Sequence, residues 1–236
     1  MQFDTVVVGA GIAGASLAYH LAPHERVGVL ELEEQPGYHS TGRSAALFME
    51  TYGTPMIRAL TCASRAFYID PPEGFTAQAI LSPRGAMHVA KTGQEQELAD
   101  ALVFAQKSSP SVQLLSTAQV IQRCPALRAK RICGAIYDSD AMDIDVHALH
   151  QGYLRGLRRN GGQLLNSAGL SSAKRENGHW TIELLDGRVL SANRLVNAAG
   201  AWADVVAARC GVKPLGLQPK RRSAFTFDPP ADSDSS

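Results

Sequence analysis

The chain is poor in the features that mark secreted, metal-binding and membrane-spanning proteins. Its 236 residues include only four cysteines, which are scattered and form no CxxC pair. That pattern argues against a disulfide framework or a cysteine metal site, and it fits a reducing compartment. No apolar run is long enough to span a bilayer. From these absences we expect a cytoplasmic protein with no bound metal and no membrane span.

An excess of charge of one sign is also lacking. The formal net charge is +1, so neither nucleic acid nor an anionic membrane surface is indicated as a partner. The short basic runs at 128–131 and 220–222 are most simply solvated surface. Hydrophobic residues make up 45% of the chain, which is enough to build one large or two small cores.

Residues 3–31 predict a strand, a glycine turn, a helix and a second strand. The turn is Gly9-x-Gly11-x-x-Gly14, and it directly follows a run of three valines. Gly9 permits the tight turn, Gly11 lets a pyrophosphate approach the backbone, and Gly14 allows the helix to pack closely on the strand. An anion is favoured at the N-terminus of a helix, where backbone donors near Ala13 are among those that bind it.

The second strand ends at Glu31. A carboxylate at this position accepts hydrogen bonds from ribose hydroxyls and repels a 2′-phosphate. The motif therefore predicts a dinucleotide, FAD or NAD, rather than NADP. The alternative is a glycine turn without a ligand. The strand before the turn and the helix after it are the context that the motif requires, and they favour a binding site.

Beyond this unit the sequence predicts a loop followed by mixed helices and strands. Residues 34–54 are rich in Gly, Ser and Thr and predict a functional loop. The predicted helices are 56–68 with Pro55 at the first helical position, 94–107, a short helix capped by Ser116, 146–159 capped by Asp145, and 201–210. The predicted strands are 80–90 around a turn at 82–85, 134–137, 163–170, 178–185 before a hairpin turn at Asp186 and Gly187, and 195–200.

One sheet therefore receives strands from both ends of the chain, at 3–8 and 26–31 early and at 194–199 late. A region of mixed strands and helices is inserted between them. This layout predicts an α/β fold of the Rossmann-like type with an insertion, and it differs from a plain NAD dehydrogenase domain.

Five segments in this order resemble the FAD-dependent D-amino-acid oxidase and dehydrogenase family. They are VVVGAGIAGASLAYHLA, HSTGRSAA, DIDVHALHQGYLRG, RLVNAAGAWAD and LGLQPKRRSAF. The set is most similar to the catabolic D-arginine dehydrogenase subgroup. The resemblance implies a discontinuous FAD-binding domain at 1–80 and 145–215. It also implies an incomplete α+β substrate domain at 81–144 and 216–228, and the polar tail at 229–236 is expected to be disordered.

The resemblance also implies which residues contact the flavin cofactor. Glu31 and Leu32 are expected at the adenosine ribose, Leu170 at the adenine through its backbone, and Gly200 at a turn near the dinucleotide. Asn197 and Trp202 are expected to be structural. The loop past the pyrophosphate toward the isoalloxazine is expected to be formed by Ser40, Thr41, Gly42, Arg43, Ser44, Ala45 and Ala46. Its alternative is an ordinary polar surface loop.

The chemistry that the resemblance implies is hydride transfer from a substrate Cα–H to FAD, giving an imine that hydrolyses. Arg222 matches a position that clamps the substrate carboxylate, and Tyr52 matches a lid tyrosine. The alternatives are a solvated arginine and an ordinary, partly buried aromatic. The substrate is expected to be a small amino acid or amine.

The chain departs from the D-arginine dehydrogenase pattern in three ways. Leu47 stands where that pattern has a histidine, and Ala86 stands where it has a glutamate that grips a cationic side chain, so D-arginine and D-lysine are disfavoured. Family members also run past residue 236. We therefore expect a truncated or split product, with a complementing C-terminal polypeptide as a partner. Two hypotheses follow, a dehydrogenase-like enzyme that is active when complete or complemented, and a non-catalytic flavoprotein remnant.

Overall fold

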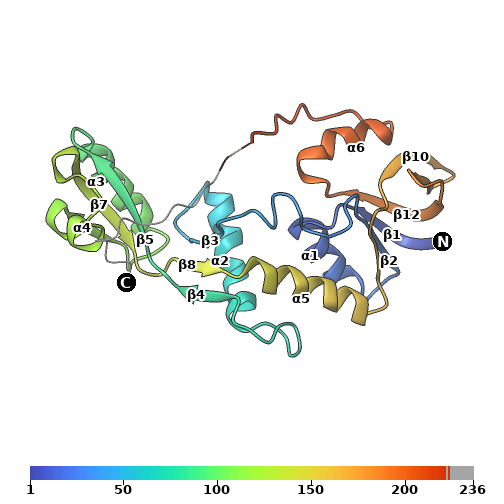
Figure 1. Cartoon of the computed structure of the whole chain (residues 1–236), viewed down its shortest axis with the longest axis horizontal. Helices are drawn as coiled ribbons and strands as arrows, with labels where there is room; N and C mark the ends of the chain where they lie inside the picture. The colour runs from blue at the N-terminus through green and yellow to red at the C-terminus, as the bar shows by residue number, and fades with distance from the viewer. Residues whose placement is uncertain (222, 224–236) are drawn as a thin grey trace.

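The computed structural model describes residues 1–221 and residue 223, in three sheets with helices packed on them. Arg222 and the predicted tail at 229–236 lie outside the described residues. The largest sheet lies at one end of the molecule, and the sheet that contains β5 and β7 lies at the other (Figure 1).

The largest sheet has the strand order β10-β11-β12-β1-β2-β9. Its parallel part consists of β1 (Gln2–Val8), β2 (Val27–Leu30), β9 (Gln163–Leu165) and β12 (Val189–Asn197). β1 lies between β12 and β2, with Val7 opposite Val196 on one side and Val29 on the other. The prediction that strands from both ends of the chain share one sheet is confirmed.

Alternating side chains of β1 face two different cores. Val7 and Val29 pack against α1 (Ile12–Leu21) and α5 (Val146–Arg159). Val6 and Val8 face the opposite side, where β10 (Leu170–Glu176) and β11 (His179–Leu184) fold over the parallel strands. The run of valines is buried on both faces, as expected for a central parallel strand.

The single strand predicted at 163–170 is wrong, because the structure divides it into β9 and β10 at opposite edges of the sheet. Ser167 has φ of 48°, a left-handed conformation that ends an extended run. The N–H groups of Ser167 and Ala168 then bond to the carbonyls of Glu33 and Glu31. The hairpin at Asp186 and Gly187 is confirmed, with the Gly187 N–H bonded to the Leu184 carbonyl at 3.0 Å.

The other two sheets have three strands each. One has the order β3-β8-β4, made by β3 (Leu47–Phe48), β8 (Met142–Ile144) and β4 (Leu81–Pro83). The other has the order β5-β7-β6, made by β5 (Ala86–Lys91), β7 (Ile132–Asp138) and β6 (Gln113–Ser116). The strands predicted on both sides of the turn at 82–85 are present, but they join different sheets rather than pairing with each other.

The helices start within two residues of the predicted positions. Thr54 caps α2 (Pro55–Ile69), with Pro55 as its first residue, and Asp145 caps α5 by accepting a 2.7 Å bond from the Ala148 N–H. Ser116 and Gln119 form a capping box that starts the short α4 (Thr117–Arg123). α3 is Glu95–Gln106, and 3-10 turns lie at η1 (Ala129–Arg131) and η2 (Gly200–Trp202). Among the described residues, no helix combines the length and the apolar character needed to cross a bilayer.

Asp204, on α6 (Ala203–Arg209), organises the chain that follows this helix. Its carboxylate accepts hydrogen bonds from the backbone N–H groups of Leu215, Gly216 and Leu217 at 2.9, 2.8 and 2.7 Å. These bonds, that from Leu215 foremost, lower the pKa of Asp204, so the carboxylate is ionised at neutral pH.

Asp204→Ala is expected to speed hydrogen exchange at the amides of Leu215, Gly216 and Leu217, because it removes their shared acceptor. Exchange followed by NMR at neutral pH would measure this. The amide of Cys210, which bonds to the Val206 carbonyl, is the internal control and is expected to keep its rate. Unchanged exchange at all four amides would contradict the assignment.

Candidate functional site

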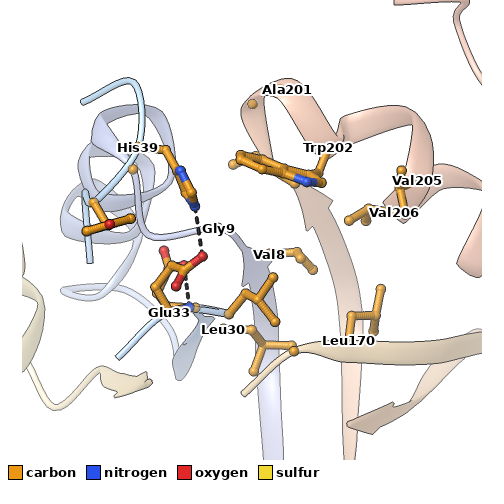
Figure 2. A pocket seen from close by; sticks show the side chains of 18 of the residues that line it. Val8, Gly9, Leu30, Glu33, His39, Leu170, Ala201, Trp202, Val205 and Val206 are labelled. Atoms are coloured by element: carbon orange, nitrogen blue, oxygen red, sulfur yellow. Dashed lines mark hydrogen bonds and ion pairs between the residues drawn. The ribbon is translucent and has the colours of Figure 1, made fainter. Parts of the chain in front are cut away.

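A cavity of about 330 Å³ opens at the carboxyl ends of β1, β2 and β12 (Figure 2). This edge is where open parallel sheets bind their ligands. The predicted site residues that line the cavity are Gly9, Gly11, Glu31, Leu32, Ser40, Thr41, Leu170 and Gly200. The structure therefore brings together residues from four separate segments of the chain.

The three glycines of the turn occupy positions with little or no room for a side chain. Gly9 has φ of +102°, and a Cβ there would lie 2.5 Å from the Ala198 carbonyl oxygen. A Cβ on Gly14 would lie 1.9 Å from the Gly9 carbonyl oxygen, so the backbone of α1 is in direct contact with the backbone of the turn. At Gly11 the nearest atom to a Cβ would be Thr41 Oγ1 at 3.2 Å. This geometry fits the role predicted for each glycine.

Glu31 links the end of β2 to the glycine turn. Its carboxylate accepts hydrogen bonds from the Ala10 N–H at 2.9 Å and from the Glu33 N–H at 3.0 Å. The side chain is thereby held at the cavity wall, where a ribose would meet it. The Glu31 carboxylate is thus held by two backbone donors beside the first cavity.

The loop after β2 runs from this cavity to a second one. Thr41 accepts a 3.0 Å hydrogen bond from the Ile12 N–H, and thus satisfies one of the free donors at the start of α1. Farther along the loop, Ser44, Ala45 and Ala46 line a second cavity of about 650 Å³. An elongated ligand lying along this loop would contact both cavities.

Four of the predicted cofactor residues line neither cavity. Ala13 lies at the exposed start of α1, and Gly14 is buried beneath the turn. Gly42 closes the loop on itself through a 2.7 Å bond from its N–H to the Gly37 carbonyl. The guanidinium of Arg43 lies over the Tyr38 ring, 4.7 Å from its centroid.

The second cavity has a mainly apolar wall in the part of the chain that the structure describes. Tyr52 and Leu47 belong to this wall, whereas Ala86 does not. Ile57, Leu60, Thr61, Ser64 and Tyr68 reach it from one face of α2. Its polar side chains are hydroxyls and the His88 imidazole, with no carboxylate, lysine or arginine among them. Such a surface favours an apolar ligand group over a charged one.

Several residues that line the first cavity were not predicted as site residues. Trp202, expected to be structural, lines the cavity, and its indole lies 4.5 Å from the His39 ring, centroid to centroid. His39 in turn bonds to the Glu33 carboxylate at 2.8 Å (Figure 2). Asn197 does act structurally, since its amide donates to the Ala203 carbonyl. The aromatic signal of Trp202, two residues after Gly200, was visible in the sequence.

His150 was also missed, and it lies beneath the glycine turn. The ring is 3% exposed, and its Nε2 is 2.7 Å from the Ala10 carbonyl oxygen. Burial lowers the pKa of His150, which keeps the ring neutral at neutral pH. Its spacing from Val146 and Tyr153 places it on the inner face of α5, and this was the signal available.

A protein-family model described as FAD dependent oxidoreductase matches residues 4–236. The chain belongs to the FAD dependent oxidoreductase family. The prediction of FAD as the cofactor is confirmed by this membership, and the glycine turn, the fixed Glu31 carboxylate and the cavity between them fit a dinucleotide.

Similar proteins of this family include oxidoreductases with different substrates in their names. Human mitochondrial dimethylglycine dehydrogenase is 29% identical over 216 residues, covering 89% of this chain and 24% of that protein. The L-2-hydroxyglutarate dehydrogenase of Escherichia coli K12 is 25% identical over 230 residues, covering 92% and 51%. The chain thus spans from about a quarter to about half the length of these relatives.

The fold is also that of solved family structures. The crystal structure of glycine oxidase from Geobacillus kaustophilus superposes with a TM-score of 0.78 at 23% identity, covering 89% of this chain and 58% of that one. This likeness confirms the predicted α/β fold class.

Proposed function

We propose that this chain forms the FAD-binding part of an oxidoreductase that oxidises the Cα–N bond of an amino acid or amine. The observation that carries the proposal is the first cavity, where the glycine turn, Glu31 and the loop at 40–46 meet at the carboxyl edge of the sheet. Dimethylglycine dehydrogenase and glycine oxidase are named for amine substrates, which supports a Cα–N bond over the Cα–O bond of a hydroxy acid.

In this proposal the residues at 1–80 and 145–215 hold FAD, and those at 81–144 and 216–228 contribute to the substrate side. Glu31 and Leu32 bind the ribose region, Leu170 and Gly200 border the adenosine, and the backbone near Ala13 faces the pyrophosphate. The loop from Ser40 to Ala46 carries the cofactor toward the second cavity. The four cysteines are free thiols, in keeping with a reducing compartment, so a cytoplasmic location belongs to the same proposal.

Bound FAD supplies the hydride acceptor. The chain's own residues orient the substrate, with Tyr52 at the wall of the second cavity and Arg222 as part of a carboxylate clamp. The described wall of this cavity has no carboxylate to pair with a cationic side chain. We therefore propose an amine or amino acid with an uncharged side chain as the substrate, and disfavour D-arginine and D-lysine.

The purified 236-residue chain is expected to bind FAD and become yellow. Under anaerobic conditions, the flavin absorbance is expected to bleach with at least one amine in a panel of D-amino acids, N-methylglycines and 2-hydroxy acids. Bleaching by hydroxy acids alone would replace the Cα–N assignment with a Cα–O one. The same assay is run with a candidate complementing C-terminal polypeptide co-expressed, since the chain spans only part of the length of its relatives.

A second candidate is a flavoprotein remnant that binds FAD without turnover. Leu47 favours it, because a leucine beside the second cavity neither donates a hydrogen bond nor carries charge. A yellow protein that no member of the panel bleaches, with or without the co-expressed polypeptide, would establish this candidate. A colourless folded protein would contradict both.

A further inference from the structure

His150 is a buried titratable side chain that belongs to neither cavity wall. It lies on α5 and touches the glycine turn from the side away from the ligand, with Nε2 2.7 Å from the Ala10 carbonyl oxygen. A carbonyl oxygen only accepts hydrogen bonds, so Nε2 carries the proton and donates it. The ring is therefore held as one defined tautomer.

Two side chains hold the backbone N–H and the backbone carbonyl of Ala10. Its N–H donates to Glu31 at 2.9 Å, and its carbonyl accepts from His150. Two residues on, the Ile12 N–H donates to Thr41 at 3.0 Å. Three side chains from three different segments thus fix the backbone of the turn between Gly9 and Ala13.

His150 also sets the position of the loop that carries Thr41. A Cβ on Gly37 would lie 2.9 Å from the His150 Cε1 atom, so the loop backbone rests directly on the imidazole. Gly37 lines the first cavity and accepts the Gly42 N–H through its carbonyl. The same ring thereby touches the turn and the start of the loop.

We propose that His150 is a positioning residue of the FAD site, which holds the Ala10 peptide and the Gly37 backbone so that the turn faces the pyrophosphate. Gly11 is the N-cap of α1 and Ala13 is its second residue, and N–H groups at these positions have no partner within a helix. The direction of these N–H groups depends on the orientation of the Ala10 backbone before them. This inference rests on FAD binding at the first cavity, and it is independent of the substrate.

The test compares two variants that fill the same space with different chemistry. In His150→Gln, the side-chain amide Nε2 can donate a hydrogen bond from about the same position as the imidazole Nε2. His150→Leu keeps a side chain of similar size but has no hydrogen-bond donor. FAD affinity is measured by titrating apoprotein and following flavin fluorescence. Loss of a buried bond to the turn predicts about tenfold weaker binding for His150→Leu, and the glutamine is expected to restore most of it.

A stability control separates positioning from general weakening of the fold. Leu154, one turn farther along α5, is fully buried in the core that includes Leu149 and Tyr153, and it is absent from both cavity walls. Leu154→Ala is expected to lower the melting temperature at least as much as His150→Leu while keeping the wild-type FAD affinity of the folded protein.

Equal affinities for the wild-type protein and His150→Leu would overturn the inference and leave the FAD site intact. Weakening of the same size in His150→Gln, or in Leu154→Ala, would also overturn it, since the donor would then not matter. A folded wild-type protein that binds no FAD would overturn both the inference and the proposed function.

Discussion

Gly14→Ala is expected to abolish FAD binding and to destabilise the fold. The added methyl would lie 1.9 Å from the Gly9 carbonyl oxygen and 3.3 Å from a Val7 methyl group. Neither neighbour is a flexible chain end, so α1 must move away from β1. Overpacking of this kind costs about 3 kcal/mol, a large share of the stability of an ordinary domain. Denaturant unfolding measures the loss of stability, and flavin fluorescence measures FAD binding.

Gly11→Ala is the matched comparison, because Gly11 has φ of −69°, which alanine adopts without strain. Its methyl would meet only Thr41 Oγ1 at 3.2 Å. This variant is expected to unfold near the wild-type midpoint but to bind FAD weakly, since the methyl occupies the approach of the pyrophosphate. If Gly14→Ala were as stable as Gly11→Ala, the fold would not depend on the close packing of α1 against the glycine turn.

Glu31→Ala has the second-largest expected effect, about 100-fold weaker FAD binding, equivalent to about 2.7 kcal/mol. The carboxylate accepts hydrogen bonds from the N–H groups of Ala10 and Glu33, and it lines the first cavity, where we propose that the ribose hydroxyls bind. Alanine removes the bonds to the turn together with those to the ribose. Equilibrium titration of apoprotein with FAD measures the change.

Glu34→Ala is the control for lost negative charge. Glu34 is exposed, lies in the same loop and is absent from the wall of the first cavity. It is expected to leave FAD affinity within about twofold, because exposed charges outside a site contribute little. Similar losses in the two variants would show that the net charge of the loop, and not the placement of Glu31, determines the affinity.

The sequence predicts the central unit well because its signals are local. A valine strand, a glycine turn and an acid at the end of the next strand each follow from steric and electrostatic needs of nearby residues, and β1, α1 and β2 are found there. The proline at the first position of α2 and the helix caps at Ser116 and Asp145 are equally local. Each of these predictions depends on residues within a few positions of one another.

Predictions that depend on distant partners succeed less often. Alternation alone could not reveal that β4 and β5 join different sheets, or that Ser167 divides a strand whose halves reach opposite edges. His150 looks like one more inner-face residue of an amphipathic helix, and its role follows only from the Ala10 carbonyl, 140 positions away in the chain. Such contacts are set by tertiary packing and leave no periodic signal.

The pairing of β1 with β12 determines when the nascent chain can acquire its cofactor. β1 is synthesised before β12, so one edge of β1 stays open until Val189–Asn197 emerges and pairs with it. Ala198 then bonds to the Val8 carbonyl and closes the wall beside Gly9. Contacts so distant in sequence form slowly, and domains are completed in the order of synthesis. We therefore expect FAD to bind only after β12 has been synthesised, and a chain that ends before β12 to be unable to capture FAD.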